Sequence, residues 1–165
     1  MNNYSGVLFL HAISKAAAEE LPALFLKLQI RVKHFEWKLQ PLVVGSVRTT
    51  IEWSSSVDVA PQLVTELASQ QNIRFEVTQN QAKLQIGRRW SFSPGLGIYA
   101  AAIDEAGNVM IAENQIRNAL YGSANDLLKT QATLRRLLGT SWDDDLERFR
   151  AQEYELEKNW LIGLG

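Results

Sequence analysis

Hydrophobic and polar residues alternate along three stretches of the chain, with a period of two that is typical of half-buried strands. The apolar positions of these stretches are Phe35, Trp37 and Leu39, then Val47, Ile51 and Trp53, and then Ile73, Phe75 and Val77. A fourth stretch, Val7-Leu8-Phe9-Leu10, is apolar at every position. This composition predicts a strand that is covered on both faces and is therefore central in its sheet.

Two helices are expected between these strands. Apolar residues recur at helical spacing over Leu21–Leu28, after a possible N-cap at Ser14, and Pro22 favours a helix that begins near Leu21 over a kinked one. A second helix has Asp58 as its predicted N-cap and Pro61 in its first turn. The resulting order, β-α-β-β-α-β, predicts a ferredoxin-like split β-α-β antiparallel sheet within an α+β fold.

The rest of the chain is predicted to extend this half. A strand over 83–93 that is bulged at Gly87, a turn, a strand over 98–103, a loop over 104–108 and a strand over 109–111 form hairpins. Helices follow, and one of them is stopped by Gly139. We expect a single domain over 1–165, with a ferredoxin-like half at 1–80 and a β-hairpin and helical extension at 81–165 packed on it. The last helix opens at Thr140, and its apolar stripe either ends before Glu153 or resumes after it.

Composition and charge exclude several classes of function. The chain has 165 residues, of which 46% are hydrophobic and 21% are charged, as in an ordinary globular domain. Its net charge of -1 provides no overall attraction to nucleic acid or to an anionic membrane. The absence of cysteine excludes disulfides and thiolate chemistry, and two histidines disfavour a metal site, so we expect no cofactor. Without a basic leader or a long apolar run, a cytoplasmic location is expected.

The outward face of the predicted sheet carries charges of both signs and no aromatic ring. Its residues are His34, Glu36, Lys38, Arg48, Thr50, Glu52, Arg74, Glu76 and Thr78. RNA-recognition sheets stack bases on exposed rings, whereas the rings from Phe35 to Phe75 fall on the inward parity here. Nucleic acid is therefore disfavoured as a partner. Leu8 and Leu10 would need cover from the C-terminal extension.

The stretch from Gly87 to Gly97 has the strongest features of a binding site. Arg88 and Arg89 beside Trp90 could hold a phosphate or carboxylate, and the turn Ser93-Pro94-Gly95-Leu96-Gly97 allows a ligand to approach the backbone closely. The alternative is an arginine pair on a strand edge next to a tight turn.

His11 ends the first strand just ahead of a predicted helix start, where it could add to an anion site. A lone histidine at a strand end is more often a packed, hydrogen-bonded residue.

The most distinctive string is Trp142-Asp143-Asp144-Asp145-Leu146-Glu147-Arg148-Phe149-Arg150. Three acids after Ser141 suit the positive end of a helix dipole, Ser141 with Asp144 resembles a capping box, and Asp144 with Arg148 is an i,i+4 pair. These local effects explain most of the string. A hard-cation site is disfavoured because adjacent helical carboxylates diverge and further oxygen ligands are missing.

Together with Val7-Leu-Phe-Leu-His11, Ile73-Arg-Phe-Glu-Val77 and Trp90-Ser-Phe-Ser-Pro-Gly-Leu-Gly-Ile98, this string resembles an actinobacterial family of uncharacterised proteins, domain of unknown function 3145. The resemblance covers most of the chain. It implies a small bacterial cytoplasmic protein without an assigned activity, and it supplies no catalytic residues.

Two functions from different classes remain. We favour a non-enzymatic interaction or regulatory module that binds an unknown protein or itself, through the open sheet edge or the stripe from Trp142 to Trp160, although both tryptophans could instead pack intramolecularly. The alternative is a small-molecule binder or enzyme that holds an anionic ligand through Arg88, Arg89 and His11.

Overall fold

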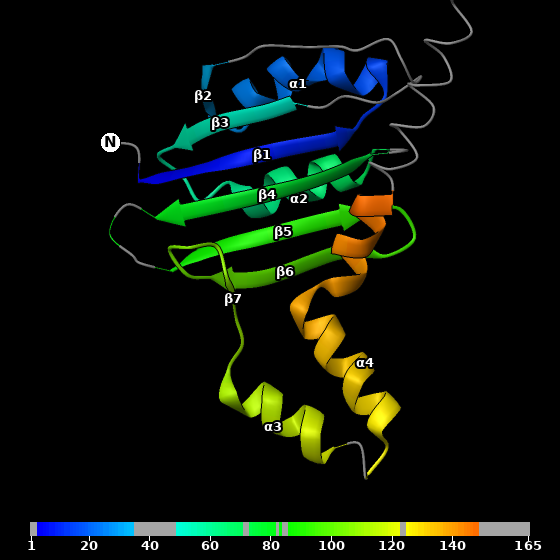
Figure 1. Ribbon diagram of the computed structural model, residues 1–165. Helices are drawn as coiled ribbons and strands as arrows, with labels where there is room; N and C mark the ends of the chain where they lie inside the picture. Colours follow the sequence, from blue (N-terminus) through cyan, green and yellow to red (C-terminus); the bar gives the residue numbers. More distant parts are fainter. Residues whose placement is uncertain are drawn as a thin grey trace, which may run out of the picture.

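The structure, a computed structural model, describes residues 3–34, 49–70, 73–81, 83, 86–122 and 125–148. In this part of the chain seven strands form one antiparallel sheet in the order β2-β3-β1-β4-β5-β6-β7 (Figure 1). The strands are β1 Tyr4–Ala12, β2 Arg31–His34, β3 Thr49–Ser55, β4 Arg74–Gln81, β5 Gly87–Ser93, β6 Gly97–Ile103 and β7 Val109–Met110. The helices are α1 Lys15–Lys27, α2 Ala60–Ala68, α3 Glu113–Tyr121 and α4 Leu127–Leu138, and residues 140–148 are also helical.

Strand β1 lies between β3 and β4, which confirms its predicted central place. Leu8 and Leu10 are buried, but Phe9 on the opposite face is 37% exposed, so cover on both faces is incomplete. Leu8 pairs in register with Ile51 and Val77 and shares the core with α1 and α2. The expectation that the C-terminal extension covers Leu8 and Leu10 is therefore wrong.

The sheet is larger than the predicted ferredoxin-like half. Elements β1, α1, β2, β3, α2 and β4 follow one another in the expected chain order, and β5, β6 and β7 continue the same sheet beyond β4. The fold is thus α+β with one seven-stranded sheet in the described part of the chain. The predicted strand over Phe35–Leu39 lies outside the described residues.

Helix α1 begins earlier than the sequence predicts. Ser14 is its N-cap, and the Ser14 hydroxyl accepts a hydrogen bond from Ala17 N at 3.2 Å. Pro22 lies inside the helix on the exposed side, so the predicted start near Leu21 is wrong. The proline removes one backbone hydrogen bond, and burial of Leu21 and Phe25 against the sheet offsets this loss.

The start of α2 is capped by a side chain from β4. Gln79 is buried, its Oε1 accepts from Ala60 N at 3.1 Å, and its Nε2 donates to Asp58 Oδ1 at 2.7 Å. Asp58 was the predicted N-cap, but Val59 occupies that position and makes no side-chain cap. The buried amide of Gln79 does the work of a local cap and ties the helix to the sheet.

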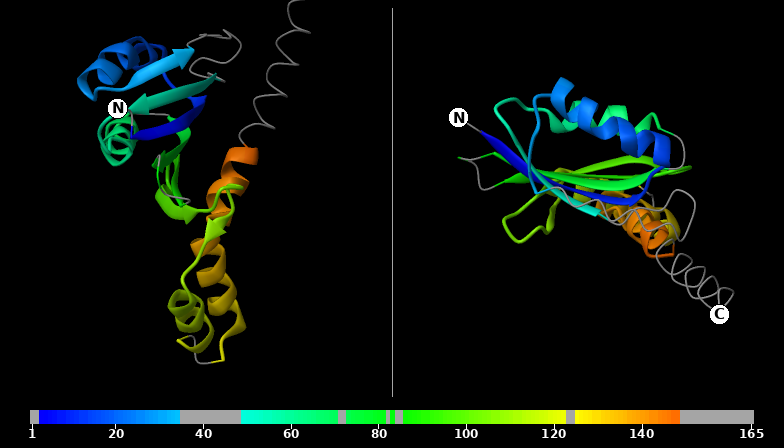
Figure 2. Two further views of the ribbon diagram at one scale, coloured as in Figure 1. Left: turned by 90° about the vertical axis from the view of Figure 1, so that its left-hand side faces the viewer. Right: turned by 90° about the horizontal axis from the view of Figure 1, so that it is seen from above.

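Helices cover the two faces of the sheet unequally. Helices α1 and α2 lie on one face, and the helix at 140–148 crosses the opposite one (Figure 2). We call the face that the helix at 140–148 crosses the outer face. The core lies under α1 and α2, and its largest fully buried side chains are those of Trp53, Phe75, Leu8, Leu10, Ile13, Leu21, Ile51, Leu63, Leu67, Ile73 and Val77.

The predicted hairpins and stops of the second half are confirmed. Pro94-Gly95 occupies the turn between β5 and β6, with Gly95 at a φ of +86°, and Gly107 at +84° closes the turn between β6 and β7. Gly139, at a φ of +71°, ends α4. The β5–β6 register is continuous from Gly87 to Ser93, so no bulge lies there.

Gly6 provides a test of the packing of β1. A Cβ on Gly6 would collide with the Thr78 carbonyl and lie 2.7 Å from the Trp53 ring. We expect Gly6→Ala to lower the free energy of unfolding by about 1–3 kcal/mol in urea titrations. The adjacent exposed change Ser5→Ala should stay within about 0.5 kcal/mol of the original protein. Equal effects of the two changes would contradict this close packing.

Candidate functional site

Residues 88–93 alternate between the two faces of β5. Trp90 belongs to the core beneath α1 and α2 and shares its face with Arg88, whereas Arg89, Ser91 and Ser93 point to the outer face. The two guanidiniums predicted to hold one ligand therefore lie on opposite faces of the sheet, because consecutive strand residues point in opposite directions.

Arg88 already has partners on its own face. Its Nη1 lies 3.5 Å from Asp58 Oδ2, and its guanidinium carbon lies 5.1 Å from the centroid of the Trp90 ring. Both charged side chains are about half exposed, so this ion pair contributes little to stability.

The outer face brings His11 and Arg89 onto one side of the sheet. His11 is 8% exposed, and its Nε2 lies 2.9 Å from Glu76 Oε2. Glu76 pairs in register with Ser91, two residues from Arg89. His11, Arg89 and Ser93 from the predicted site thus share the outer face, whereas Arg88 and Trp90 do not.

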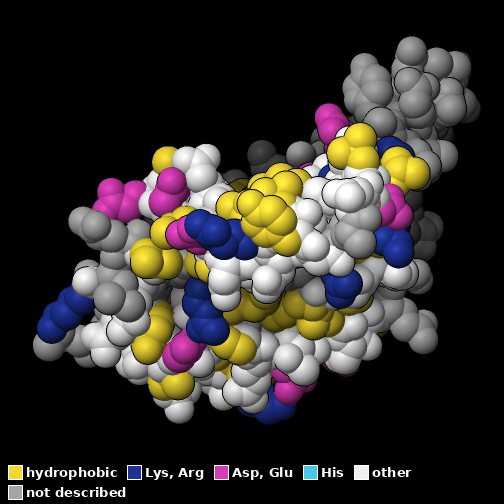
Figure 3. All heavy atoms as spheres, turned by 90° about the horizontal axis from the view of Figure 1, so that it is seen from below, with side chains coloured by type: hydrophobic (Ala, Val, Ile, Leu, Met, Phe, Trp, Pro, Cys, Tyr) yellow, Lys and Arg dark blue, Asp and Glu magenta, His cyan; other side chains and the backbone are white. Residues whose placement is uncertain are grey.

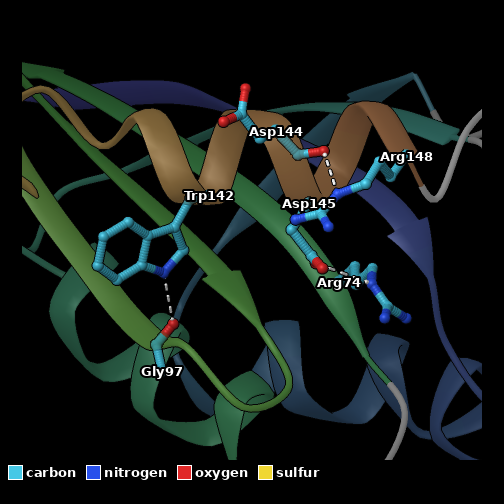
Figure 4. A network of polar contacts seen from close by, with 6 residues as sticks. All are labelled: Arg74, Gly97, Trp142, Asp144, Asp145 and Arg148. Carbon is cyan, nitrogen blue, oxygen red and sulfur yellow. Dashed lines mark hydrogen bonds and ion pairs between the residues drawn. The ribbon is translucent and has the colours of Figure 1, made fainter. Parts of the chain in front are cut away.

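Two side chains of the helix at 140–148, those of Trp142 and Asp145, hold it on this face. Trp142 Nε1 donates to the Gly97 carbonyl at 2.9 Å, and its ring lies 5.2 Å from that of Tyr99. Asp145 Oδ2 lies 3.4 Å from Arg74 Nε (Figure 4). Trp142 is 8% exposed, which is the intramolecular packing that the sequence left as an alternative to a contact surface.

Tyr99 also joins this helix to the preceding one. Its hydroxyl donates to the Leu137 carbonyl in the last turn of α4 at 2.7 Å. A Cβ on Gly139 would lie 2.5 Å from the Tyr99 ring, so both the positive φ and the close approach require glycine there. We call the group of Tyr99, Leu137, Gly139 and Trp142 the β6–α4 junction.

The acidic string makes different contacts from those predicted. Asp144 Oδ2 lies 3.2 Å from Arg135 Nη2, and Arg148 Nε donates to the Asp144 carbonyl at 3.3 Å, so the predicted i,i+4 ion pair is wrong. Trp142 N donates to the Gly139 carbonyl at 3.1 Å, since the helix begins directly after α4, and Ser141 forms no capping box. Trp160 lies outside the described residues.

Three hydrogen-bonding groups on the outer face of β5 are buried and have no partner among the described residues. They are Arg89 Nε, Ser91 Oγ and Ser93 Oγ, and both serines are fully buried. Buried polar atoms are nearly always hydrogen-bonded, so three on one strand face call for an explanation. Alternate residues of a strand are about 6.8 Å apart, so a ligand would need a separate acceptor oxygen for each of these groups.

Burial on this face, modified by neighbouring charges, raises two pKa values. Burial raises the pKa of the Asp143 carboxyl, an effect opposed by the Arg89 guanidinium and reinforced by Glu76 and Asp144. Burial likewise raises the pKa of the Tyr99 phenol, where Arg89 opposes the shift and Asp143 adds to it. The Arg89 guanidinium is therefore close enough to the Asp143 carboxyl to oppose the rise of its pKa.

A cleft of about 870 Å³ lies between β6 and α4. Figure 3 shows the molecule from below Figure 1, the side toward which α3 and α4 extend. Hydrophobic side chains gather there in a patch on the surface and along a hollow. The cleft is lined by Leu96, Ile98, Tyr99, Ala100, Ala101, Ala102, Met110, Ile111, Ala112, Gln115, Thr133, Arg136, Leu137 and Trp142. Its walls are largely apolar, and Arg136 is the one charged side chain among them.

Metal and membrane sites receive no support from the described residues. Within the ranges given above, no three His, Asp or Glu side chains converge as metal ligands. In that same part of the chain no helix has the length and apolar character needed to cross a membrane.

Comparison with known proteins gives one result. The sequence model of a family described as "Protein of unknown function (DUF3145)" matches residues 7–163. The chain belongs to this family. No curated protein and no solved structure matches it. Membership in the DUF3145 family assigns no function, so the function must be inferred from the geometry.

The sequence contained signals for some of this site and not for the rest. Strand alternation alone separates Arg88 from Arg89, because the strand was predicted correctly. The run Ala100-Ala101-Ala102 shows that one strand has unusually small side chains, which leaves room beside it. Nothing local shows that α4 returns to face that strand, because the β6–α4 junction joins residues about forty positions apart.

The raised pKa of Asp143 predicts a pH-dependent gain from its removal. The folded protein binds this proton more tightly than the unfolded chain, so stability falls as pH rises from the ordinary carboxyl pKa through the raised one. Asp143→Asn should therefore raise the free energy of unfolding at pH 7, by less than about 1 kcal/mol because the carboxyl is partly exposed.

Urea titrations at several pH values check this, and the gain should vanish below the ordinary carboxyl pKa. Asp144→Asn is the matched control, since Asp144 pairs with Arg135, and it should give no gain. A gain for Asp143→Asn that persists in acid would contradict the electrostatic cause.

Proposed function

We propose that this member of the DUF3145 family is a non-enzymatic interaction module that self-associates through the helical hairpin of α3 and α4, which we call the arm. The arm extends away from the sheet (Figures 1 and 2). The observation that carries the proposal is the exposure of its large apolar side chains, between 38% and 78%, at Ile116, Leu120, Tyr121, Leu127, Leu128 and Leu138.

The arm buries too little to be stable by itself. Among the described residues of α3 and α4, Ala119 is the one that is buried, and α4 has none. Helices of nine and twelve residues are marginal in water, and most helices in proteins are stabilised by packing of an apolar face. Burial of this face in a complex would supply the missing stabilisation.

A second copy of the chain is the partner that fits this surface most simply. Leu127, Leu134 and Leu138 recur at seven- and four-residue spacing on α4, beside Ile116 and Leu120 on α3. Two such hairpins related by a twofold axis would bury their apolar faces as a four-helix bundle. A net charge of -1 opposes this contact little.

We also propose more specific assignments of the fold, the location and the origin of the protein. We infer that residues 1–80 form a ferredoxin-like split β-α-β unit, which the sheet order β2-β3-β1-β4 supports, with β5 to β7 added to it. The cysteine-free composition supports a cytoplasmic location. An actinobacterial origin rests on the resemblance of the sequence motifs alone.

Self-association is tested by light scattering after gel filtration over a range of concentrations. The original protein should form dimers, and the double change Leu127→Lys with Leu138→Lys should convert it to monomer, because it places charges on the apolar face. Leu26→Lys is the control, since Leu26 is 82% exposed on α1, and it should leave the dimer intact. A monomer at all concentrations, or equal effects of the variants, would refute self-association through the arm.

Binding of a small anion is a second candidate function. The unpartnered donors of Arg89, Ser91 and Ser93 favour it, since the oxygens of a carboxylate or phosphate accept hydrogen bonds from such groups. Asp143 lies near Arg89, so such a ligand would have to displace the Asp143 carboxylate.

A thermal-shift panel of inorganic phosphate, nucleotides, sugar phosphates and carboxylates tests this candidate. A ligand at one hundred times its dissociation constant should stabilise the fold by about 2.7 kcal/mol. Arg89→Ala should abolish the shift, whereas Arg88→Ala, which changes the neighbouring guanidinium on the opposite face, should preserve it. No response from any anion, or the same loss in both variants, would eliminate anion binding here.

A further inference from the structure

Strand β6 has an unpaired edge. Strand β7 pairs only with Ala102 and Ile103, so no described strand lies against β6 from Gly97 to Ala101 on that side. This open edge is about 17 Å long, at about 3.4 Å per residue. Unpaired strand edges of this kind are the sites at which another extended chain adds to a sheet.

The direction of the backbone groups follows from the hairpin beside them. Asp104 N donates to the Asn108 carbonyl at 3.0 Å, toward the β7 side. Because backbone groups alternate in direction along a strand, Ala102, Ala100 and Ile98 also present their N–H and C=O groups to that side. Ala102 is opposite Met110 in β7, which leaves Ile98 and Ala100 without a strand partner.

Helix α4 faces this edge across the cleft. One wall of the cleft is β6, and the other includes Thr133, Arg136 and Leu137 of α4. Leu96, Ile98 and Met110, which line the same cleft, are each more than 40% exposed. A groove between a strand edge and a helix offers backbone hydrogen bonds on one side and apolar side-chain contacts on the other.

We propose that the cleft binds an extended peptide segment of a partner protein, which adds to the sheet as a strand beside β6. Backbone hydrogen bonds to Ile98 and Ala100 supply affinity independent of sequence, as in other cases of β-strand addition. This binding site is separate from the apolar face of the arm, so it stands whether or not the protein self-associates.

The cleft also specifies the chemistry of the peptide. Alternate side chains of an added strand would contact the apolar lining from Met110, Ile111 and Leu137, so apolar residues are expected at every second position. Arg136 has no carboxylate partner among the described residues, whereas its neighbour Arg135 pairs with Asp144. An acidic residue in the peptide would pair with Arg136.

Selection from a phage-displayed library of random heptapeptides tests the proposal. The enriched peptides should carry apolar residues at alternate positions and one acidic residue. In fluorescence polarisation with an enriched peptide, Arg136→Gln should weaken binding about tenfold. Arg135→Gln should leave it unchanged, and so should the double change Leu127→Lys with Leu138→Lys.

N-methylation of those alternate peptide amides that face β6 should abolish binding, because it removes the donors that an added strand needs. No enrichment, apolar residues at helical spacing, or equal losses for Arg135→Gln and Arg136→Gln would overturn the proposal. Tighter binding of a synthetic peptide of residues 149–165 would make this chain the source of the segment and overturn the assignment to a partner.

Discussion

The β6–α4 junction fixes the position of the C-terminal helices relative to the sheet. Tyr99 binds the end of α4 through its hydroxyl and the Trp142 ring through its own ring, and the Trp142 indole N–H bonds to the Gly97 carbonyl. Gly139 allows the two helices to meet at this point because a side chain there would collide with Tyr99. The end of α4 and the start of the helix at 140–148 are thereby both tied to β6.

This attachment has different consequences for the two helices that it joins. The helix at 140–148 lies down on the outer face, where Asp145 reaches Arg74 and Asp143 lies near Arg89. Helix α4 instead leaves the sheet beside the edge of β6, so a cleft remains between them and the arm exposes its leucines. A single anchoring point therefore explains why one helix is packed and its predecessor is largely exposed.

The sequence predicted those elements whose causes are local. Alternation located β3 and β4, and Gly107 and Gly139 marked a turn and a helix end, because each depends on neighbouring residues alone. Pro22 misled the prediction for α1, since packing of Leu21 and Phe25 outweighs one lost hydrogen bond. Capping of α2 by Gln79, about twenty residues away, has no local signal.

The candidate sites divide in the same way. That Arg88 and Arg89 face opposite sides follows from strand alternation, whereas the contacts of Asp144 and Trp142 depend on where two distant helices meet β6. An open sheet edge follows from the predicted fold, but periodicity does not show which strand forms it or that a cleft lies beside it, because an edge is defined by the strand that is missing beside it.

Amide hydrogen exchange along β6, followed by NMR, tests the open edge most directly. The amides of Ile98 and Ala100 point toward the cleft and should exchange much faster than those of Tyr99 and Ala101, which point toward β5. Equal protection of all four amides, or faster exchange at Tyr99 and Ala101, would contradict an unpaired edge facing α4.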